Sequence, residues 1–133
     1  MTQHATGTFE VKMQPQGEGD VAEGSSLARM SLDKRFSGDL EATGKGEMLA
    51  ARSDVATSAA YVAIERVSGT LQGRQGSFAL VHKGVMTKEA QNLVIEVVPD
   101  TGTGQLKGLA GALGIRIEDG RHYYDFKYSL PGE

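Results

Sequence analysis

The alternation of apolar and polar side chains with a period of two is the feature that most constrains this chain. Over residues 61–71 and 78–82, most of the residues at every second position are apolar. That period sets successive side chains on opposite faces of a β-strand, whereas an α-helix repeats every 3.6 residues. Since no segment keeps a helical period, the sequence predicts an all-β fold.

Turn signals predict two hairpins. Asp119-Gly120 is typical of a two-residue type I′ turn. In the Gly-Arg-Gln-Gly segment over residues 73–76, we place the two turn residues at Arg74 and Gln75. Both registers set mostly apolar residues opposite one another, which supports them. The opposed pairs are Leu71 with Phe78, Gly69 with Leu80, Val67 with His82, Ile117 with His122, Ile115 with Tyr124, Leu113 with Phe126 and Gly111 with Tyr128.

Further strands alternate with polar, glycine-rich connections. The expected strands cover residues 8–13, 28–40, 48–50 and 93–98, and the expected connections cover residues 15–26, 43–46, 53–59 and 99–104. About eight strands joined mostly by hairpins form a meander, and closure into a barrel removes its exposed edges. We therefore predict one domain, residues 1–133, folded as a closed antiparallel eight-stranded β-barrel. A two-sheet sandwich is the alternative, but glycines inside strands favour a tightly curved sheet.

The composition argues against several function classes. The net charge is −3 and no basic run occurs, whereas a nucleic-acid surface needs concentrated positive charge. No apolar run is long enough to span a membrane, and the first nine residues do not resemble a signal peptide. The chain has no cysteine, which excludes disulfides and thiolate zinc sites and fits a cytoplasmic location.

One glycine-rich segment resembles a known family. Residues 102–111, with the sequence GTGQLKGLAG, are similar to the strand motif of the allene oxide cyclase and dirigent barrels. Across most of its length the chain also resembles a narrower group of small bacterial proteins of unknown function with the same barrel. Residues 7–11, 38–40, 61–67, 69–71, 76–82 and 98–104 carry this second resemblance. It implies an eight-stranded barrel that often self-associates, and it brings no established activity and no active-site residues.

Three ionisable side chains lie on the predicted inner face. Lys34, Glu65 and His82 each have mostly apolar neighbours two positions away. In the predicted register Glu65 lies diagonal to His82, within reach of its side chain. A dry interior penalises unpaired charges, so these groups either pair with one another or face water or a ligand. One interpretation is a satisfied polar network that only stabilises the fold. The other is an acid–base pair in which the carboxylate orients the imidazole and raises its basicity.

Aromatic residues follow on the last predicted strand. His122, Tyr124, Phe126 and Tyr128 share one face, which core packing explains, although the polar tips can also line a pocket mouth. The histidines lack the spacing of a metal site, so we predict no metal and no cofactor. The predicted ligand-binding residues are Lys34, Tyr61, Glu65, Phe78, His82, His122, Tyr124 and Tyr128, with Glu65 and His82 as the candidate catalytic pair.

The leading hypothesis is a protein that binds a small, mostly apolar molecule inside the barrel. One alternative is a cofactor-free cyclase, isomerase or lyase that uses Glu65 and His82 as acid and base. Another is a structural oligomer with a solid core. The outer face of the central hairpin is also apolar, at Val62, Ile64, Ala79, Val81 and Val85. Because contiguous apolar patches on a surface usually mark an interface, we expect this face to pack against a second copy of the chain. The alternative is that the loop over residues 15–26 covers it.

Overall fold

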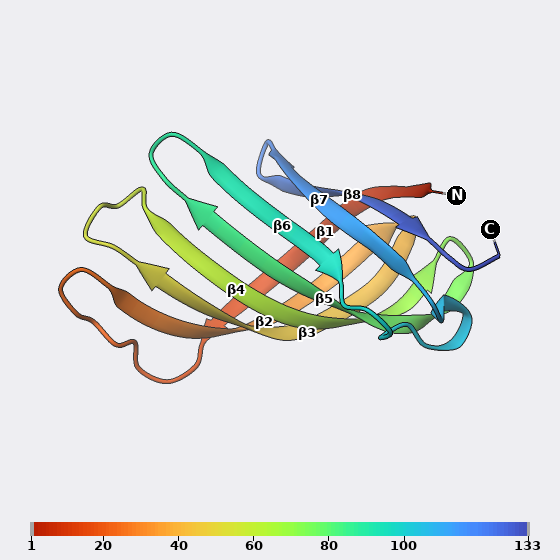
Figure 1. Ribbon diagram of the computed structural model, residues 1–133, viewed down its shortest axis with the longest axis horizontal. Helices are drawn as coiled ribbons and strands as arrows, with labels where there is room; N and C mark the ends of the chain where they lie inside the picture. Colours follow the sequence, from red (N-terminus) through yellow and green to blue (C-terminus); the bar gives the residue numbers. More distant parts are fainter. Residues whose placement is uncertain (1, 133) are drawn as a thin grey trace.

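The computed structural model describes residues 2–132, which form eight antiparallel strands closed into a barrel in the order β1 to β8 (Figure 1). The strands are β1 (Gln3–Pro15), β2 (Ser26–Gly38), β3 (Leu40–Arg52), β4 (Ala59–Leu71), β5 (Arg74–Met86), β6 (Gln91–Val97), β7 (Ala110–Glu118) and β8 (Arg121–Ser129). This closed eight-stranded barrel confirms the predicted fold class. Within residues 2–132, no helix has the length and hydropathy needed to cross a membrane.

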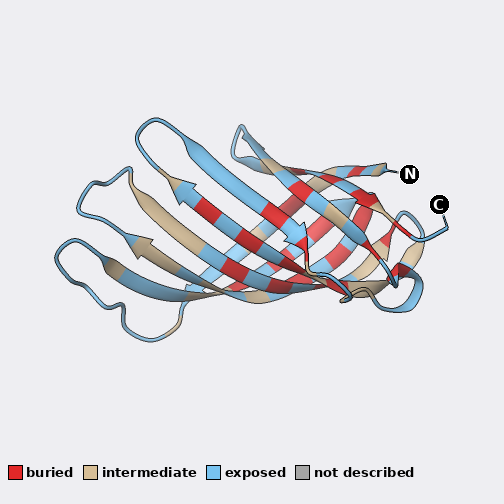
Figure 2. Ribbon diagram, viewed as in Figure 1, coloured by how far each residue is buried: buried red, intermediate tan, exposed pale blue. Residues whose placement is uncertain are grey.

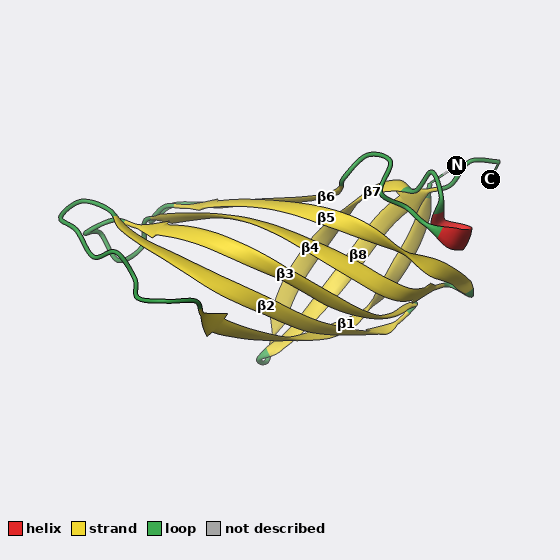
Figure 3. Cartoon of the chain, turned by 90° about the horizontal axis from the view of Figure 1, so that it is seen from below, coloured by secondary structure: helices red, strands yellow, loops and turns green. Residues whose placement is uncertain are grey.

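The two ends of the barrel differ in packing (Figure 2). At one end, which we call the packed end, a short 3-10 helix (Gly104–Leu106) lies beside both chain termini (Figure 3). The inward-facing side chains there are buried. At the other end, which we call the open end, strands β2 to β6 project beyond the tip of the β7–β8 hairpin (Figure 1). Inward-facing side chains there stay exposed, at 51% for Met13, 43% for Leu93 and 63% for Ile117.

The seam between β6 and β7 holds few backbone pairs. Every other pair of neighbouring strands is in register over seven or more residues. Between β6 and β7, the described residues are paired only at Glu96 and Ala112. The barrel wall therefore has the fewest backbone hydrogen bonds between β6 and β7, from the Glu96–Ala112 pair toward the open end.

The turn between β4 and β5 differs from the prediction. The two turn residues are Gln72 and Gly73, both with positive φ (45° and 87°), as a type I′ turn requires. The predicted turn at 74–75 was wrong, and with it the pairs of that hairpin: Val67 opposes Phe78, and His82 opposes Ala63. The other observed pairs of this hairpin include Glu65 with Leu80, Gly69 with Gly76 and Leu71 with Arg74. Because the shift is even, every side chain keeps its predicted face.

Gly76, the second glycine of the segment over residues 73–76, lies outside the turn and allows a close backbone contact. A Cβ atom on Gly76 would lie 2.1 Å from the carbonyl oxygen of Thr103, so the loop between β6 and β7 crosses directly over this position. Glycine inside a strand often marks such a close backbone approach. The predicted turn was misplaced because the two glycines were expected to flank it, whereas Gly73 lies in the turn itself and Gly76 lies in β5.

The connection predicted at residues 43–46 is also absent. Strand β3 runs without interruption through these residues, and the chain reverses instead at Gly38 and Asp39. In contrast, the β7–β8 hairpin is confirmed: Asp119 and Gly120 have positive φ (50° and 78°). All four of its predicted pairs are present, from Ile117 with His122 to Gly111 with Tyr128.

Candidate functional site

The three ionisable residues predicted on the inner face meet in the middle of the barrel. The Lys34 Nζ atom lies 2.8 Å from Glu65 Oε1, and His82 Nε2 lies 2.7 Å from the same oxygen. Their exposed fractions are only 7%, 1% and 3%, respectively. We call these three residues the buried polar network. It lies between the packed core and the exposed inward-facing side chains of the open end.

Glycines on β3 allow this network to form. Lys34 is on β2 and Glu65 is on β4, so β3 separates them and their backbones are about 10 Å apart. The inward positions of β3 between them are Gly44 and Gly46, which oppose Lys34 and Glu65 respectively. A Cβ atom on Gly44 would lie 2.5 Å from Glu65 Oε2. The missing side chains therefore leave the space in which the lysine and the carboxylate meet.

Charge fixes the protonation of the Glu65–His82 hydrogen bond. Burial alone would raise the pKa of Glu65, but the hydrogen bond from His82 and the charge of Lys34 outweigh it and hold this pKa below its usual range. An ionised carboxylate only accepts hydrogen bonds, so the proton between the two groups belongs to His82 Nε2. The His82 Nδ1 atom makes no hydrogen bond to residues 2–132 and is the proton-free nitrogen when the imidazole is neutral.

One atom of the network is unsatisfied. Glu65 Oε2 is the buried side-chain polar atom within residues 2–132 that has no hydrogen-bond partner. Most buried polar atoms in proteins are hydrogen-bonded, so an orphaned carboxylate oxygen calls for an explanation. The interpretation of a fully satisfied structural network therefore accounts for Oε1 but not for Oε2.

Tyr61 and His122 lie near the network, toward the open end. The Tyr61 ring packs across Gly84, where a Cβ atom would lie 2.4 Å from Cε1, and its centroid is 6.4 Å from that of His82. Burial and the charge of Glu65 raise the pKa of Tyr61, so its hydroxyl stays protonated and can donate. The half-buried His122 ring lies 5.0 Å from Phe9, the same ring that Lys34 Nζ approaches to 5.2 Å.

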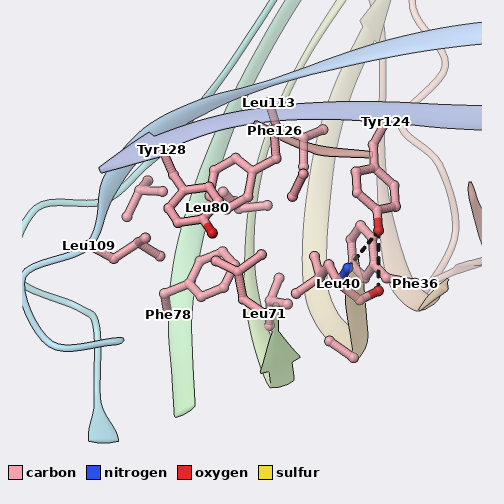
Figure 4. Packing of buried hydrophobic residues seen from close by; sticks show 14 of the residues in the cluster. Phe36, Leu40, Leu71, Phe78, Leu80, Leu109, Leu113, Tyr124, Phe126 and Tyr128 are labelled. Carbon is pink, nitrogen blue, oxygen red and sulfur yellow. Dashed lines mark hydrogen bonds between the residues drawn. The ribbon is translucent and has the colours of Figure 1, made fainter. Parts of the chain in front are cut away.

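The other predicted ligand-binding residues lie in the packed end. Phe78, Tyr124 and Tyr128 are buried in the main core (Figure 4). The Tyr124 hydroxyl accepts from the Leu40 amide at 2.8 Å and lies 2.9 Å from the Ser37 carbonyl oxygen. The Tyr128 hydroxyl contacts the Gln72 side chain. Both tyrosine hydroxyls are thus already engaged by the protein, and Phe78 packs in the core, so these three residues belong to the packed end and not to the surroundings of the network.

The structure also shows features that sequence reasoning missed. The glycines of β3 had been assigned to a turn, although glycine within an alternating strand signals a close approach. Among residues 2–132, no group of three or more histidine, cysteine, aspartate or glutamate side chains is arranged to hold a metal ion.

Comparisons with known proteins agree with the fold. Residues 5–128 match the model of a family described as "Protein of unknown function (DUF3224)". A crystal structure of a protein with unknown function from the DUF3224 family of Shewanella oneidensis MR-1 is similar, with 47% sequence identity and a TM-score of 0.94. That match covers 100% of both chains. The search of the curated proteins gave no match.

Proposed function

Because the chain belongs to the DUF3224 family, whose description names no activity, we infer its function from its own side chains. We propose that it binds a small, mostly apolar molecule at the open end of the barrel. The observation that carries this proposal is the unsatisfied oxygen Glu65 Oε2, which faces the space left by Gly44, in a barrel whose open end exposes inward-facing apolar side chains. The buried polar network is then the polar floor of the site, and the open-end side chains are its walls.

The cost of burying the network supports this proposal. Removing a carboxylate and an ammonium group from water costs several kcal/mol per ion. The attraction within the buried pair offsets this cost only if the remaining lone pairs are hydrogen-bonded. Here one carboxylate oxygen takes both donors and the other takes none. A ligand that donates a hydrogen bond to the floor, with a small shift of the carboxylate, would complete the network.

The exposed walls support it as well. Met13, Leu93 and Ile117 share the inward face with buried core residues yet remain about half exposed. Scattered surface residues of this kind are ordinary, but large apolar side chains gathered above convergent polar groups are typical of ligand sites. The loosely paired seam between β6 and β7 borders the same region and offers room for these walls to move.

The free polar atoms define the chemistry of the ligand. Glu65 Oε2 is an acceptor, and so is His82 Nδ1 in the neutral imidazole, so the ligand needs a hydrogen-bond donor such as a hydroxyl group. The Tyr61 hydroxyl can contribute a donor of its own. The expected ligand is therefore an apolar molecule with one or two polar groups rather than a pure hydrocarbon or a multiply charged anion.

Isothermal titration calorimetry with two matched probes tests this function. 1-Naphthol carries a hydroxyl donor, and 1-methoxynaphthalene has nearly the same shape without one. We expect 1-naphthol to bind about tenfold more tightly, because a hydrogen bond to a charged acceptor contributes about 1.5–3 kcal/mol. Equal affinities, or no binding of either probe, would overturn the proposal.

Strand alternation provides a matched pair of variants for the same titration. Met48 and Leu49 are neighbours on β3, and they face inward and outward respectively. Met48→Glu should abolish binding of 1-naphthol because it places a charge on the inner wall, whereas Leu49→Glu should leave binding unchanged. The reverse result would place the ligand on the outer face.

A general-base enzyme is the second candidate, because the Glu65–His82 hydrogen bond leaves Nδ1 as a base. This base would remove a proton from a carbon next to a carbonyl group, and the same proton would return at the end of an isomerisation or cyclisation. Exchange of the α-hydrogens of 1-tetralone in D₂O, followed by NMR, tests this step. Acceleration by the wild type and not by His82→Gln would support catalysis, and no acceleration by either would leave binding alone.

Kinship with the allene oxide cyclase barrels and a cytoplasmic location belong to the same proposal. The closed eight-stranded meander and the glycine-rich segment 102–111 support the kinship. The lack of cysteine supports the location.

A further inference from the structure

Methionines gather at the open end of the barrel. Of the five methionines in the chain, Met13, Met30, Met48 and Met86 lie on β1, β2, β3 and β5. By strand alternation all four share the inward face with the buried core residues of their strands. None of the four is fully buried. We call these four residues the methionine rim.

Two members of the rim are direct neighbours. Met30 opposes Met48 across the β2–β3 pair, and Met13 opposes Leu32, one inward position along β2 from Met30. Directly opposed side chains have Cβ atoms about 5 Å apart, and diagonal ones remain within reach of long side chains. Three thioethers therefore lie within contact distance of a single ligand.

We infer that the methionine rim selects aromatic ligands and accepts several of them. This inference rests on the proposed function, since it names the ligand class of the same site. A thioether is polarisable and makes favourable contacts with aromatic rings, which a saturated ring of equal size does not receive. Methionine also has three rotatable bonds, so the rim adapts to rings of different outline, as methionine-rich surfaces do elsewhere. The ligand class is thus flat aromatic molecules that carry a hydrogen-bond donor.

The test compares 1-naphthol with decahydro-1-naphthol, which keeps the hydroxyl group and the carbon skeleton but has no aromatic ring. Wild-type protein should bind 1-naphthol about tenfold more tightly, since two or three sulfur–aromatic contacts add to this level. The double variant Met30→Leu/Met48→Leu keeps the volume and apolarity of the rim. It should lose most of that preference while it retains the affinity for the saturated probe. Leu49→Met, a swap of similar size on the outer face, is the matched control and should change neither affinity.

Labelling the methionine methyl groups with ¹³C locates the bound ring. The Met30 and Met48 methyl signals, assigned through the single leucine variants, should shift when 1-naphthol is added. Equal affinities for the two probes, or a preference that survives the double variant, would overturn the inference. So would unshifted methyl signals. If neither probe binds the wild type, the proposed function itself fails, which is a different result from equal binding.

A second observation lies on the outer face. A groove of about 540 Å³ crosses strands β2 to β5 on the side away from the barrel interior. Its walls are mostly apolar and include Leu27, Leu49, Val62 and Val85, of which three are about half exposed and Val85 is 38% exposed. Ile64 and Val81, also exposed, continue the apolar surface along β4 and β5.

We propose that a second copy of this chain covers the outer groove. The charges around it carry both signs: Arg29 and Lys83 come from the strands, and Glu18 and Asp20 come from the loop after β1. A surface that packs against its own copy in a symmetric dimer needs both signs, because each basic group must find an acidic one on the same patch. A surface built for an acidic or basic partner would carry one sign.

Sedimentation at micromolar concentration tests the dimer. The wild type should sediment as a dimer and Leu49→Glu as a monomer, while Met48→Glu, which changes the inner face of the same strand, should remain dimeric. A monomeric wild type would overturn the proposal and leave the groove to another occupant. An unchanged Leu49→Glu dimer would overturn it too, since the copies would then associate elsewhere.

Discussion

The packed end and the open end of this barrel are built from the same strands, yet they treat their inward-facing side chains in opposite ways. Leu71 at the end of β4 and Phe126 on β8 are completely buried in the packed core, whereas Ile117 near the tip of the β7–β8 hairpin is 63% exposed. The same contrast holds for polar groups. The Tyr124 hydroxyl at the packed end is held by backbone groups, whereas Glu65 Oε2 at the boundary has no partner. The packed core and the proposed binding site therefore lie at opposite ends of the barrel axis, with the buried polar network at the border.

The largest expected effect is a core truncation at the packed end. The Phe126 ring stacks on those of Phe78 and Tyr128, with centroids 5.7 Å and 5.3 Å away. Phe126→Ala should lower the free energy of unfolding by about 3–5 kcal/mol, measured by urea denaturation. Ile117→Ala at the open end should cost less than about 1 kcal/mol. Similar losses from both variants would remove the distinction between the two ends.

The next effect concerns the network at the border. Lys34→Met removes the cation from Glu65 and should destabilise the protein by about 3 kcal/mol, because it leaves a buried charge with one donor. Lys34→Met/Glu65→Met should recover most of this loss, since apolar residues of similar size replace a buried ion pair at little cost. Thermal or urea unfolding measures both. If the double variant is less stable than the single one, the charges stabilise the fold in their own right.

A smaller effect is expected for Tyr124→Phe at the packed end. The variant keeps the ring but leaves the Leu40 amide without its acceptor. It should cost about 1–3 kcal/mol in urea denaturation and leave the binding of 1-naphthol unchanged. Weaker binding in this variant would mean that the two ends are coupled.

The pH dependence gives the smallest effect. The pKa of Glu65 is lower in the folded protein than in the unfolded chain, so its ionised form stabilises the fold. This contribution is complete above the ordinary glutamate pKa of about 4.3 and is lost as the pH falls through the folded value. The stability difference between the wild type and Glu65→Gln should therefore be constant near neutral pH and shrink below about pH 4. A difference that grows on acidification would contradict the assignment of the charge.

Sequence reasoning predicted which face of the sheet each side chain occupies better than it predicted the position of the side chain along the barrel axis. Alternation assigns each side chain to the inner or outer face, and this assignment of Glu65 and His82 survived a misplaced turn because the register moved by an even number of residues. Alternation does not give the position of a residue along the barrel axis, which depends on the stagger between strands. For this reason Tyr124 and Tyr128 were grouped with Tyr61, although they lie at the other end.

Alternation left the pairing of Lys34 with Glu65 as one of two alternatives, for a related reason. Two side chains on strands separated by a third strand meet only if that third strand leaves room. The room here comes from Gly44, which sequence reasoning placed in a turn. A glycine at an inward position, between two strands that each carry a charge on the inner face, is the signal that would have revealed the network.

The state of His82 tests the central claim most directly. Nitrogen-15 NMR of labelled histidine distinguishes which ring nitrogen carries the proton and reports changes at the other. We predict that His82 Nε2 carries a proton, which it donates to Glu65 Oε1, and that the Nδ1 signal shifts when 1-naphthol is added, because the ligand hydroxyl reaches the polar floor. An Nε2 atom without a proton, or an Nδ1 signal that does not change when the ligand is added, would contradict this prediction.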